Sequence, residues 1–352
     1  MKRHTISVVA KHAGVSASTI SNYLNGRYGN MSFETRKRVE DAVAALNYTP
    51  NISARRLSAK EKCGVICLII PVNIATILGS FYYPTVLSSV GRVSADEDYN
   101  ILIYIRAGKD SAKEVEYLRS MYGTIADGFL LFDLTNNDFY FREFENMGIP
   151  YMCVGKIQGL EDYHYVATDH EKAMVDAVNH LAALGHKKIG FVREKGASVV
   201  PRVRQQGYEK AMRENGCTID SRYIAFPQIN PDEKESSEAI EGLLGLDDPP
   251  TAIIASINYA PAIERLCAAK GLRIPEDLSV VLLDYIDNYF ILRENDYTHA
   301  RNIADDVARK AFYSLLEQIG EPKKAGYSSQ LLSVDLVPGK STAPPPKFNK
   351  AK

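Results

Sequence analysis

The first 62 residues differ from the rest of the chain in their charge and in their helix signals. They hold eleven Lys or Arg and four Asp or Glu, a net charge of +7, whereas the remaining 290 residues have a net charge of −8. This asymmetry predicts a small cationic head on a larger anionic body. A head of this charge favours a polyanion as its partner.

Two short helices joined by a tight turn are predicted at the start of the head. Apolar residues recur at helical spacing from Ile6 to Ala13, and Gly14 ends this helix where the backbone must adopt a positive φ angle. The hydroxyl of Ser16 is placed to cap the next helix, residues 17–25. A helix, a glycine turn and a second helix are typical of the helix-turn-helix motif, in which the second helix contacts DNA.

The outer face of the second helix carries short polar side chains, which can approach base edges and phosphates closely. A third helix, residues 33–46, follows it, and then a basic segment, residues 51–59, that can form one or two helical turns. Each polar residue alone is more often plain surface, but the caps, the turn and the positive charge together favour DNA binding. The residues expected to contact DNA in this all-α head are Ser16, Ala17, Ser18, Thr19, Ser21, Asn22, Asn25 and Thr35.

Strand-like apolar runs alternate with helical stretches throughout the body. The alternation predicts two parallel sheets with helices on both faces, which makes the body a bilobed α/β structure of two Rossmann-like lobes. Ligands bind at the carboxyl ends of strands in such folds, so we expect a ligand cleft between the lobes. The first set of strands is predicted at residues 64–70, 99–105, 128–132 and 151–154, and the second at residues 165–168, 188–192, 251–255 and 278–283.

The sequence carries no strong motif for catalysis, metal binding or membrane insertion. It holds no Gly-x-Gly-x-x-Gly or Gly-x-Ser-x-Gly element and no His-Glu-x-x-His spacing, so we expect neither an enzyme nor a bound cofactor or metal ion. Its five cysteines are scattered, which favours buried free thiols. No run of about 18 apolar residues occurs, and the first residues lack the apolar core of a signal peptide. We therefore expect no membrane partner and a place in the cytoplasm, associated with the nucleoid.

Several segments resemble the LacI/GalR family of bacterial repressors. The head carries TISVVAKHAGVSASTISNYLN at residues 5–25, TRKRV at 35–39 and LNYTPNISARRL at 46–57, which are similar to the family's N-terminal signature. The body carries DGFLL at 127–131, HLAALGHKKIGFV at 180–192, RQQGY at 204–208 and IPEDLSVV at 274–281, which match the family more loosely. The resemblance implies a homodimeric transcriptional regulator, usually a repressor, that binds double-stranded operator DNA and a small-molecule effector.

The resemblance also assigns roles within the head. In this family the second helix enters the major groove, and the segment like residues 51–59 becomes a hinge helix in the minor groove of a pseudo-palindromic operator. It thereby adds Asn51, Ala54 and Leu57 to the DNA-binding residues, with Leu57 as an apolar wedge between central base pairs. The alternative for Leu57 is an ordinary linker leucine packed on the body. Many relatives carry Arg where this chain has Asn22, and Asn suits adenine instead of guanine, so we expect an altered operator.

The family's body is similar to periplasmic sugar-binding proteins, and the resemblance places candidate effector residues between the lobes. Arg204 matches an arginine that grips ligand hydroxyls or carboxylates, and Asp284 matches an acid that accepts from sugar hydroxyls, although each could instead form a surface ion pair. Two groups depart from the family, because Ser256-Ile257 replaces an Asn-Asp pair and Gly155 replaces a cleft acid. Either the effector is not a typical simple sugar or its hydroxyls are bound by other residues. The resemblance still implies a sugar or sugar derivative, and an anionic metabolite near Arg204 and Lys156 is the alternative. The candidate effector residues are Phe81, Tyr82, Lys156, Arg204, Ser256 and Asp284.

The expected domain boundaries follow from the pattern and the resemblance together. Residues 1–49 form the helix-turn-helix head, 50–61 the hinge, and 62–340 the effector-binding and dimerisation body. Lobe one takes about residues 62–163 and 291–325, lobe two about 164–290 and 326–340, and a late strand is expected to return to the first lobe. Residues 341–352 hold three prolines and no leucine heptad, which predicts a flexible tail and no tetramer. A solute-binding protein or an α/β enzyme with an accessory DNA-binding head is the alternative function.

Overall fold

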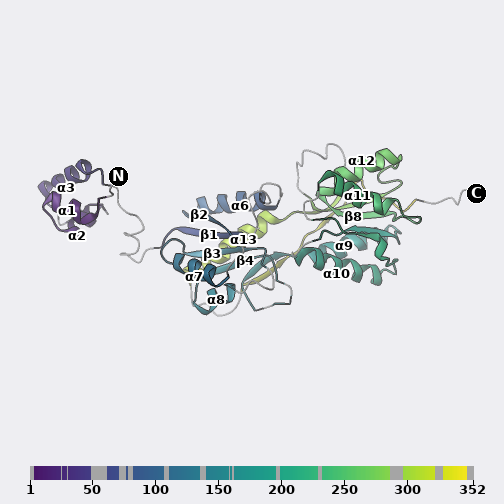
Figure 1. The fold of residues 1–352 in the computed structure, drawn as a ribbon, viewed down its shortest axis with the longest axis horizontal. Coiled ribbons are helices and arrows are strands. Elements are labelled where there is room, and N and C mark those ends of the chain that lie inside the picture. The colour runs from purple at the N-terminus through teal and green to yellow at the C-terminus, as the bar shows by residue number, and fades with distance from the viewer. Residues whose placement is uncertain are drawn as a thin grey trace, which may run out of the picture. The chain divides into compact units, whose positions relative to one another are not determined.

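The computed structural model of the chain describes residues 4–24, 26–29, 31–48, 62–70, 77, 82–106, 111–134, 140–157, 159–160, 162–195, 199–228, 232–285, 296–321 and 328–346. The chain divides after Cys63 into two compact units, the head and the body (Figure 1). Among the described residues, no helix is both long and apolar enough to cross a membrane.

In the described residues of the head, three helices surround a small apolar core. Gly14 ends the first helix with a φ angle of 64°, a conformation that favours glycine. The Ser16 hydroxyl accepts from the backbone N–H of Thr19 at 3.2 Å, as predicted for a helix cap. The helices are α1 (Ile6–Ala13), α2 (Ala17–Leu24) and α3 (Phe33–Ala45). One face of each helix supplies the core, which consists of Val9, Ala10, Ala13, Ile20, Val39 and Ala42.

The first sheet of the body has six parallel strands in the order β11-β5-β4-β3-β1-β2 (Figure 1). Its central strands are buried along almost their whole length, because helices cover both faces. The strands are β1 (Val65–Ile70), β2 (Asn100–Ile105), β3 (Gly128–Phe132), β4 (Tyr151–Val154), β5 (Tyr165–Thr168) and β11 (Ser329–Leu332). One face packs against α6 (Tyr82–Asp96) and α13 (Ala304–Gly320), the other against α7 (Ser111–Met121) and α8 (Tyr140–Asn146).

The second sheet has six strands in the order β12-β10-β9-β8-β6-β7, in which β12 runs antiparallel to β10 and the other pairs are parallel. The strands are β6 (Ile189–Val192), β7 (Ile224–Ala225), β8 (Ala252–Ser256), β9 (Ser279–Tyr285), β10 (Thr298–Arg301) and β12 (Leu336–Val337). One face packs against α9 (His170–Ala183) and α10 (Val199–Glu214), the other against α11 (Glu233–Leu244) and α12 (Ala260–Lys270). Two 3₁₀ turns, η1 (Ser221–Tyr223) and η2 (Ile257–Tyr259), connect these elements.

Three strands lie in a different sheet from the one that the expected boundaries gave them. β5, assigned to lobe two with residues 164–290, pairs with β4 and β11 in the first sheet. β10, assigned to lobe one with residues 291–325, pairs with β9 in the second sheet. β11, assigned to lobe two with residues 326–340, lies in the first sheet and is the expected late strand. The resemblance placed the crossings between the lobes near residues 164, 290 and 325, whereas the chain crosses only after β5, β10 and β11. Apolar alternation could not correct these positions, because it marks a strand without indicating which sheet it joins.

The prediction of a flexible tail over residues 341–352 is wrong for residues 341–346, which we call the C-terminal strap; residues 347–352 lie outside the described residues. Ser341 is only 3% exposed. Its backbone oxygen accepts from Val280 N at 2.8 Å, and its hydroxyl accepts from Thr298 N at 2.9 Å. Prolines exclude a helix here, but an extended segment still satisfies its polar groups on a neighbouring sheet.

Buried His186 joins the strap to the second sheet. Its Nε2 lies 2.8 Å from the carbonyl oxygen of Ala343, and its Nδ1 lies 2.8 Å from the Thr251 hydroxyl. A carbonyl oxygen only accepts, so Nε2 carries the proton and Nδ1 accepts from Thr251. The histidine is therefore a structural element of lobe two.

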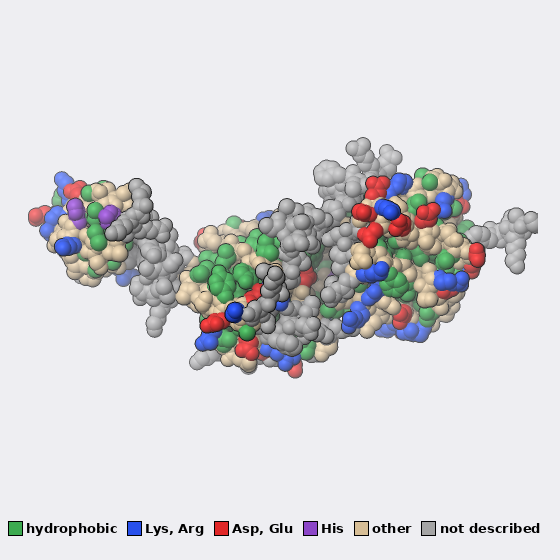
Figure 2. Space-filling model, viewed as in Figure 1, with side chains coloured by type: hydrophobic (Ala, Val, Ile, Leu, Met, Phe, Trp, Pro, Cys, Tyr) green, Lys and Arg blue, Asp and Glu red, His purple; other side chains and the backbone are tan. Residues whose placement is uncertain are grey.

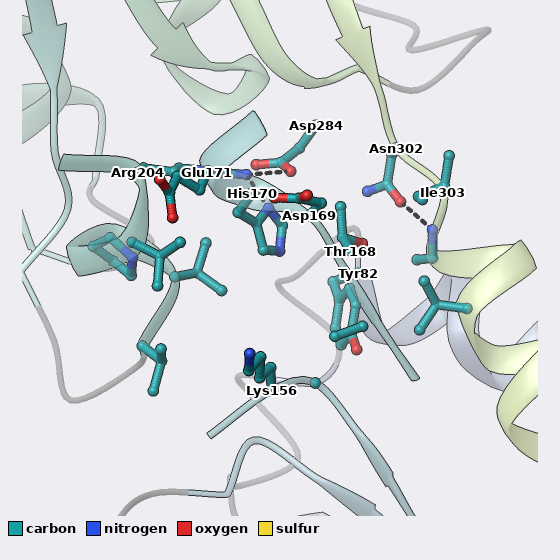
Figure 3. A pocket seen from close by; sticks show the side chains of 18 of the residues that line it. Tyr82, Lys156, Thr168, Asp169, His170, Glu171, Arg204, Asp284, Asn302 and Ile303 are labelled. Atoms are coloured by element: carbon teal, nitrogen blue, oxygen red, sulfur yellow. Dashed lines mark hydrogen bonds and ion pairs between the residues drawn. The ribbon is translucent and has the colours of Figure 1, made fainter. Parts of the chain in front are cut away.

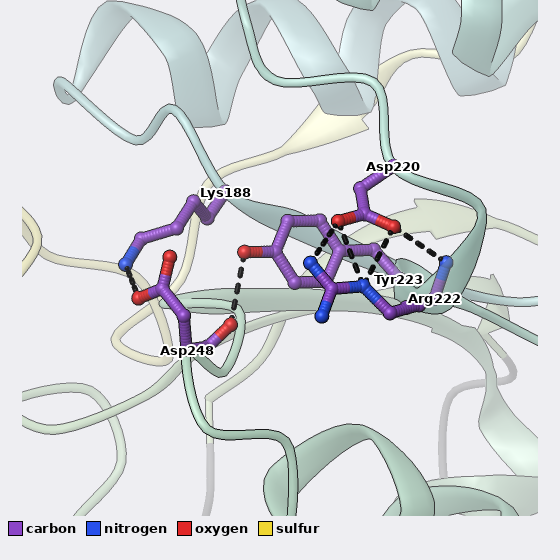
Figure 4. A network of polar contacts seen from close by, with 5 residues as sticks. All are labelled: Lys188, Asp220, Arg222, Tyr223 and Asp248. Carbon is purple, nitrogen blue, oxygen red and sulfur yellow. Dashed lines mark hydrogen bonds and ion pairs between the residues drawn. The ribbon is translucent and has the colours of Figure 1, made fainter.

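A polar network closes the amino-terminal edge of the second sheet (Figure 4). Lys188 pairs with the carboxylate of Asp248, whose backbone oxygen accepts from the phenol of Tyr223 at 2.9 Å. Beside it, the Nε of Arg222 lies 3.0 Å from an oxygen of Asp220. Exposed ion pairs add little stability, but the Tyr223 ring is buried and anchors the edge strand β7.

Candidate DNA-binding and effector-binding sites

The predicted DNA-binding residues of the head gather at the start and on the outer face of α2. Ile20 holds this helix in place, because its side chain is completely buried in the core of the head. The Ser16 hydroxyl lies 2.7 Å from that of Ser18 and 2.9 Å from that of Thr19, so the three form one polar cluster. Among the predicted residues, the exposed ones are Ser16, Ala17, Ser18 and Asn22, and the half-buried ones are Thr19, Ser21 and Thr35. Asn25, Asn51, Ala54 and Leu57 lie outside the described residues.

A basic aromatic surface beside α3 is not among the predicted residues. The guanidinium carbon of Arg36 lies 4.1 Å from the ring centroid of Tyr28, which also meets Tyr23 edge to face. Phe33, the first residue of α3, is 84% exposed. The available sequence signal is an aromatic residue placed directly after the Ser32 cap and before a run of three basic residues.

The body contains a cavity of about 520 Å³, lined where strands of the two sheets end (Figure 3). The residues that follow β3, β4 and β5 line it from the first sheet, and those at the ends of β8, β9 and β10 line it from the second. The amino-terminal turns of α9 and α10 also reach it and add positive helix-dipole ends. A volume of this size is ordinary for a small-molecule site.

Three polar side chains form a hydrogen-bonded cluster in the cavity (Figure 3). Arg204, on α10, is 8% exposed and donates from Nη2 to the Asp284 carboxylate at 2.6 Å. The same nitrogen lies 3.2 Å from Nδ1 of His170, the first residue of α9. The Nε of Arg204 is buried without a hydrogen-bond partner. One donor of the guanidinium group is therefore left over for a ligand oxygen.

The electrostatics of this cluster fix its protonation. Burial, and then the charge of Arg204, lower the pKa of His170 to about 3, so its ring is neutral and its Nδ1 can accept. Burial raises the pKa of Asp284, but the charge and hydrogen bond of Arg204 outweigh that effect and leave the pKa below its usual value. Asp284 also holds a φ angle of 58°, a strained value for a residue other than glycine.

Two further acids face the cavity from opposite sheets. Asp133 follows β3, has a φ angle of 47° and accepts from the phenol of Tyr83. It is open to the cavity yet enclosed by protein, and this burial raises its pKa. Glu194 follows β6, and burial raises its pKa as well. The Asp133 side chain keeps access to solvent through the cavity, whereas Glu194 is half-buried.

Five of the six predicted effector residues line the cavity. Lys156 holds its ammonium group 5.6 Å from the ring centroid of Tyr165. Gly155, where the family has an acid, has a φ angle of 114°, which favours glycine and accounts for the missing side chain. The five residues are Tyr82, Lys156, Arg204, Ser256 and Asp284. Phe81 lies outside the described residues.

Other cavity residues are not predicted from the sequence. They share one signal, since each lies within a few residues of the carboxyl end of a strand, where parallel sheets present ligands. Asp133 and Glu194 lie in loops, and the sequence alone does not show that these loops reach the cavity. The additional polar residues of the lining are Asp133, His170, Glu194, Asn258, Arg301 and Asn302.

Two families match the chain. Residues 5–51 match the bacterial regulatory proteins of the lacI family, and residues 178–342 match the periplasmic binding protein-like domain. Catabolite control protein A of Priestia megaterium is 29% identical over 282 residues, which are 80% of this chain and 82% of that protein. The regulator MalR of Streptococcus pneumoniae is 31% identical over 232 residues, which are 65% of this chain and 69% of that protein. The repressor CytR of Escherichia coli is 29% identical over 336 residues, 95% of this chain and 94% of that protein.

Solved structures share the fold. The lac repressor dimer bound to operator and the anti-inducer ONPF has a TM-score of 0.77 at 22% identity, over 97% of this chain and 100% of that one. The complex of the transcriptional regulator CelR with cellobiose has a TM-score of 0.68 at 24% identity, over 96% of this chain and 100% of that one. With its cationic helix-turn-helix head and its two-sheet body, the chain therefore belongs to the lacI family of bacterial regulatory proteins and is a DNA-binding transcriptional regulator.

Proposed function

We propose that this regulator represses transcription as a homodimer on a pseudo-palindromic operator, and that an effector in the cavity sets its operator affinity. One observation carries the proposal: a single chain combines an exposed polar recognition helix with a cavity lined from both sheets of the body. Among the structural neighbours, the lac repressor is a dimer bound to operator and CelR is a complex with cellobiose. By analogy we assign a sugar or sugar derivative as the effector.

On the DNA side, α2 enters the major groove. The exposed side chains of Ser18 and Asn22 then face base edges, and Asn22 has the geometry to bind N6 and N7 of adenine. The net charge of +7 on the first 62 residues supplies phosphate contacts, which make binding depend steeply on salt. Residues 50–61 act as the hinge with Leu57 as the wedge, a role that rests on the sequence resemblance because this segment lies outside the described residues.

On the effector side, Arg204 and Asp284 together offer donors and acceptors to sugar hydroxyls, and Tyr82 adds an aromatic surface. An anionic effector is less well supported. The Nη2 of Arg204 already binds Asp284, and acidic side chains outnumber basic ones in the cavity lining. We therefore favour an effector without net negative charge.

The coupling between the two sites runs through the arrangement of the two lobes. An effector that contacts residues of both sheets binds one arrangement more tightly than another and shifts the population toward it. The hinge segment forms its helix in one arrangement and loses it in the other, so operator affinity follows. Couplings of this kind amount to about 1–3 kcal/mol.

The protein acts by binding and not by catalysis in this proposal, since the relatives named above are regulators. A solute-binding protein would not need a cationic head, which disfavours that alternative. Because the head acts on chromosomal DNA, we place the protein in the cytoplasm at the nucleoid.

Fluorescence anisotropy tests the proposal. Sites would be selected from random duplexes with the full chain, and operator affinity would then be measured with sugars that raise its Tm. We expect one such compound to change operator affinity about five-fold or more, and Arg204→Ala to lose the response while keeping operator binding. If the full chain selects no sequence over random duplex, the proposal is wrong.

A further inference from the structure

Acidic side chains outnumber basic ones in the lining of the cavity, also after the ion pairs that they form with protein residues are discounted. Three of the acids are already engaged. Asp284 pairs with Arg204 at 2.6 Å, Glu171 lies 3.7 Å from Lys210, and Asp169 caps α9. In full, the lining contains the acids Asp133, Asp169, Glu171, Glu194 and Asp284 and the bases Lys156, Arg204 and Arg301.

Glu194 and Asp133 remain without a cationic partner within the described part of the chain. Asp133 has the Tyr83 phenol as a donor, so its charge is partly compensated. Glu194 follows β6 and is half-buried, and burial raises its pKa. The charge of Arg204 lowers that pKa, the charge of Asp284 raises it, and the phenol of Tyr259 lowers it as a hydrogen-bond donor, so neither acid is without a neighbouring donor. A carboxylate withdrawn from water without a cation is costly, and a bound ligand can supply that cation.

The neighbouring strand adds neutral acceptors at the same sheet edge. β6 pairs with β8 through Phe191 and Ile254, so the residues that follow these strands lie side by side. Ser256, 8% exposed, lines the cavity, and its hydroxyl makes no capping bond to η2. The side-chain oxygen of Asn258 is buried and has no hydrogen-bond partner. Glu194, Ser256 and Asn258 thus follow two paired strands and line the same cavity.

We propose that the effector is a polyhydroxylated amine, in its simplest form an amino sugar, whose ammonium group binds Glu194. The three N–H donors of an ammonium match the carboxylate of Glu194, the hydroxyl of Ser256 and the amide oxygen of Asn258. The hydroxyls of the ligand are left for the Arg204 and Asp284 cluster. This inference rests on the proposed function, because it names the chemistry of the same cavity.

The test uses the full chain and sugars that differ in one group. Glucosamine, galactosamine and the chitosan disaccharide are each compared with the N-acetylated and hydroxyl analogues and with the corresponding hexose 6-phosphates, by thermal shift and calorimetry. We expect at least one amine to bind, and its neutral analogues to bind about tenfold more weakly. The inference is overturned if a neutral or phosphorylated analogue binds as tightly as its amine, or if no amine in the set binds at millimolar concentration.

Two variants separate the charge from the fold. Glu194→Gln keeps the shape and removes the charge, so it should erase the preference for the amine and leave the Tm of the free protein unchanged or raised. Glu238→Gln, on the exposed face of α11, has the same change in net charge and should keep the preference. Equal loss in both variants, or none in Glu194→Gln, contradicts the assignment.

The outcomes also distinguish this inference from the proposed function. If a neutral sugar binds more tightly than the amines and changes operator affinity, the proposed function is supported and the assignment of an amine as the effector is wrong. If an amine binds through Glu194 without changing operator affinity, the assignment of the ligand is supported and the proposed coupling between effector and operator is wrong.

Discussion

Arg204 and Asp284 form an ion pair in which both side chains are largely removed from solvent, with 10% and 33% of their surfaces exposed. Each partner compensates a charge that would be costly alone. The pair also sets the direction of the guanidinium group, whose Nε is left without a partner. We therefore regard the pair as a preorganised ligand-binding group with a stability cost when it is broken.

A double-mutant cycle tests this interpretation. Arg204→Gln and Asp284→Asn should each lower the free energy of unfolding by about 2 kcal/mol, because each leaves its partner desolvated and unpaired. The double variant should lose at least about 1 kcal/mol less than the sum of the two. Urea denaturation of the effector-free chain measures these differences. Additive losses would mean that the two residues do not stabilise each other.

Asn22 is exposed on α2, so its replacement should change recognition and leave folding intact. Asn22→Arg exchanges a side chain suited to adenine for one that binds guanine in a bidentate manner. We expect selection from random duplexes to return a changed base at one position of each half-site, with a discrimination of about 1–3 kcal/mol. The Tm of the variant serves as the control for folding. The same base preference in parent and variant would remove Asn22 from direct readout.

At the scale of single residues, the sequence led to those side chains that a family motif carries. Arg204 stands in RQQGY, and Asp284 lies near the end of β9, the strand that begins within IPEDLSVV, so both could be predicted. Glu194 and Asp133 could not, because they follow strands in loops without a motif, and only the folded sheets bring them to one cavity. The conformational reason for Gly155, its φ angle of 114°, is likewise a property of the folded backbone.

Among the elements, the sequence predicted helices and buried strands well but not their partners. The runs that became β5, β10 and β11 are only four residues long each. The residue pattern of such a short strand indicates only that the segment is extended and partly buried. The sheet that the strand joins depends on contacts with residues that are distant in the sequence. The crossings are visible only in three dimensions, where Asp169 N donates to Leu332 O at 2.9 Å beyond the end of β5.

The C-terminal strap is an element whose contribution can be measured directly. A chain that ends at Lys340 loses the bonds of Ser341 to Val280 and Thr298 and leaves the Nε2 of His186 without Ala343. We expect its free energy of unfolding to be about 3 kcal/mol lower than that of the full chain, mainly because buried polar groups are left unpaired. A chain that ends at Pro346 keeps these bonds and is the matched control. An equal loss of Tm in both truncated chains would show that the strap is not the cause.

His186 gives the same region a pH dependence. Burial lowers its pKa in the folded chain, whereas in the unfolded chain the pKa is about 6.5. The unfolded state therefore binds more protons below pH 6.5, and the stability that neutral His186 contributes is lost as the pH falls through that value. Between pH 7.5 and 5.5 the parent should lose up to about 1.4 kcal/mol more than His186→Gln in urea denaturation. A smaller loss in the parent than in the variant would contradict the assigned direction.

For the whole molecule, the charge is divided as the function requires. On the face drawn in Figure 2, acidic side chains gather around α11, which carries Glu233, Glu235 and Glu238. A body with a net charge of −8 repels the phosphate backbone, so the affinity for DNA is concentrated in the first 62 residues. In the homodimer that we propose, regulation then needs only a change in how the two bodies hold their heads.

Linkage between the two sites is the prediction that involves the entire chain. If the effector changes operator affinity by a given factor, saturating operator must change effector affinity by the same factor, because the two equilibria share one coupling free energy. We expect this factor to be about 5–150, measured by calorimetry for the effector and by anisotropy for the operator. Residues 63–352 alone should bind the effector with the affinity of the DNA-free full chain, and operator should leave that affinity unchanged. A factor of one for the full chain, with both ligands bound, would mean that head and body act independently and that the effector does not regulate operator binding.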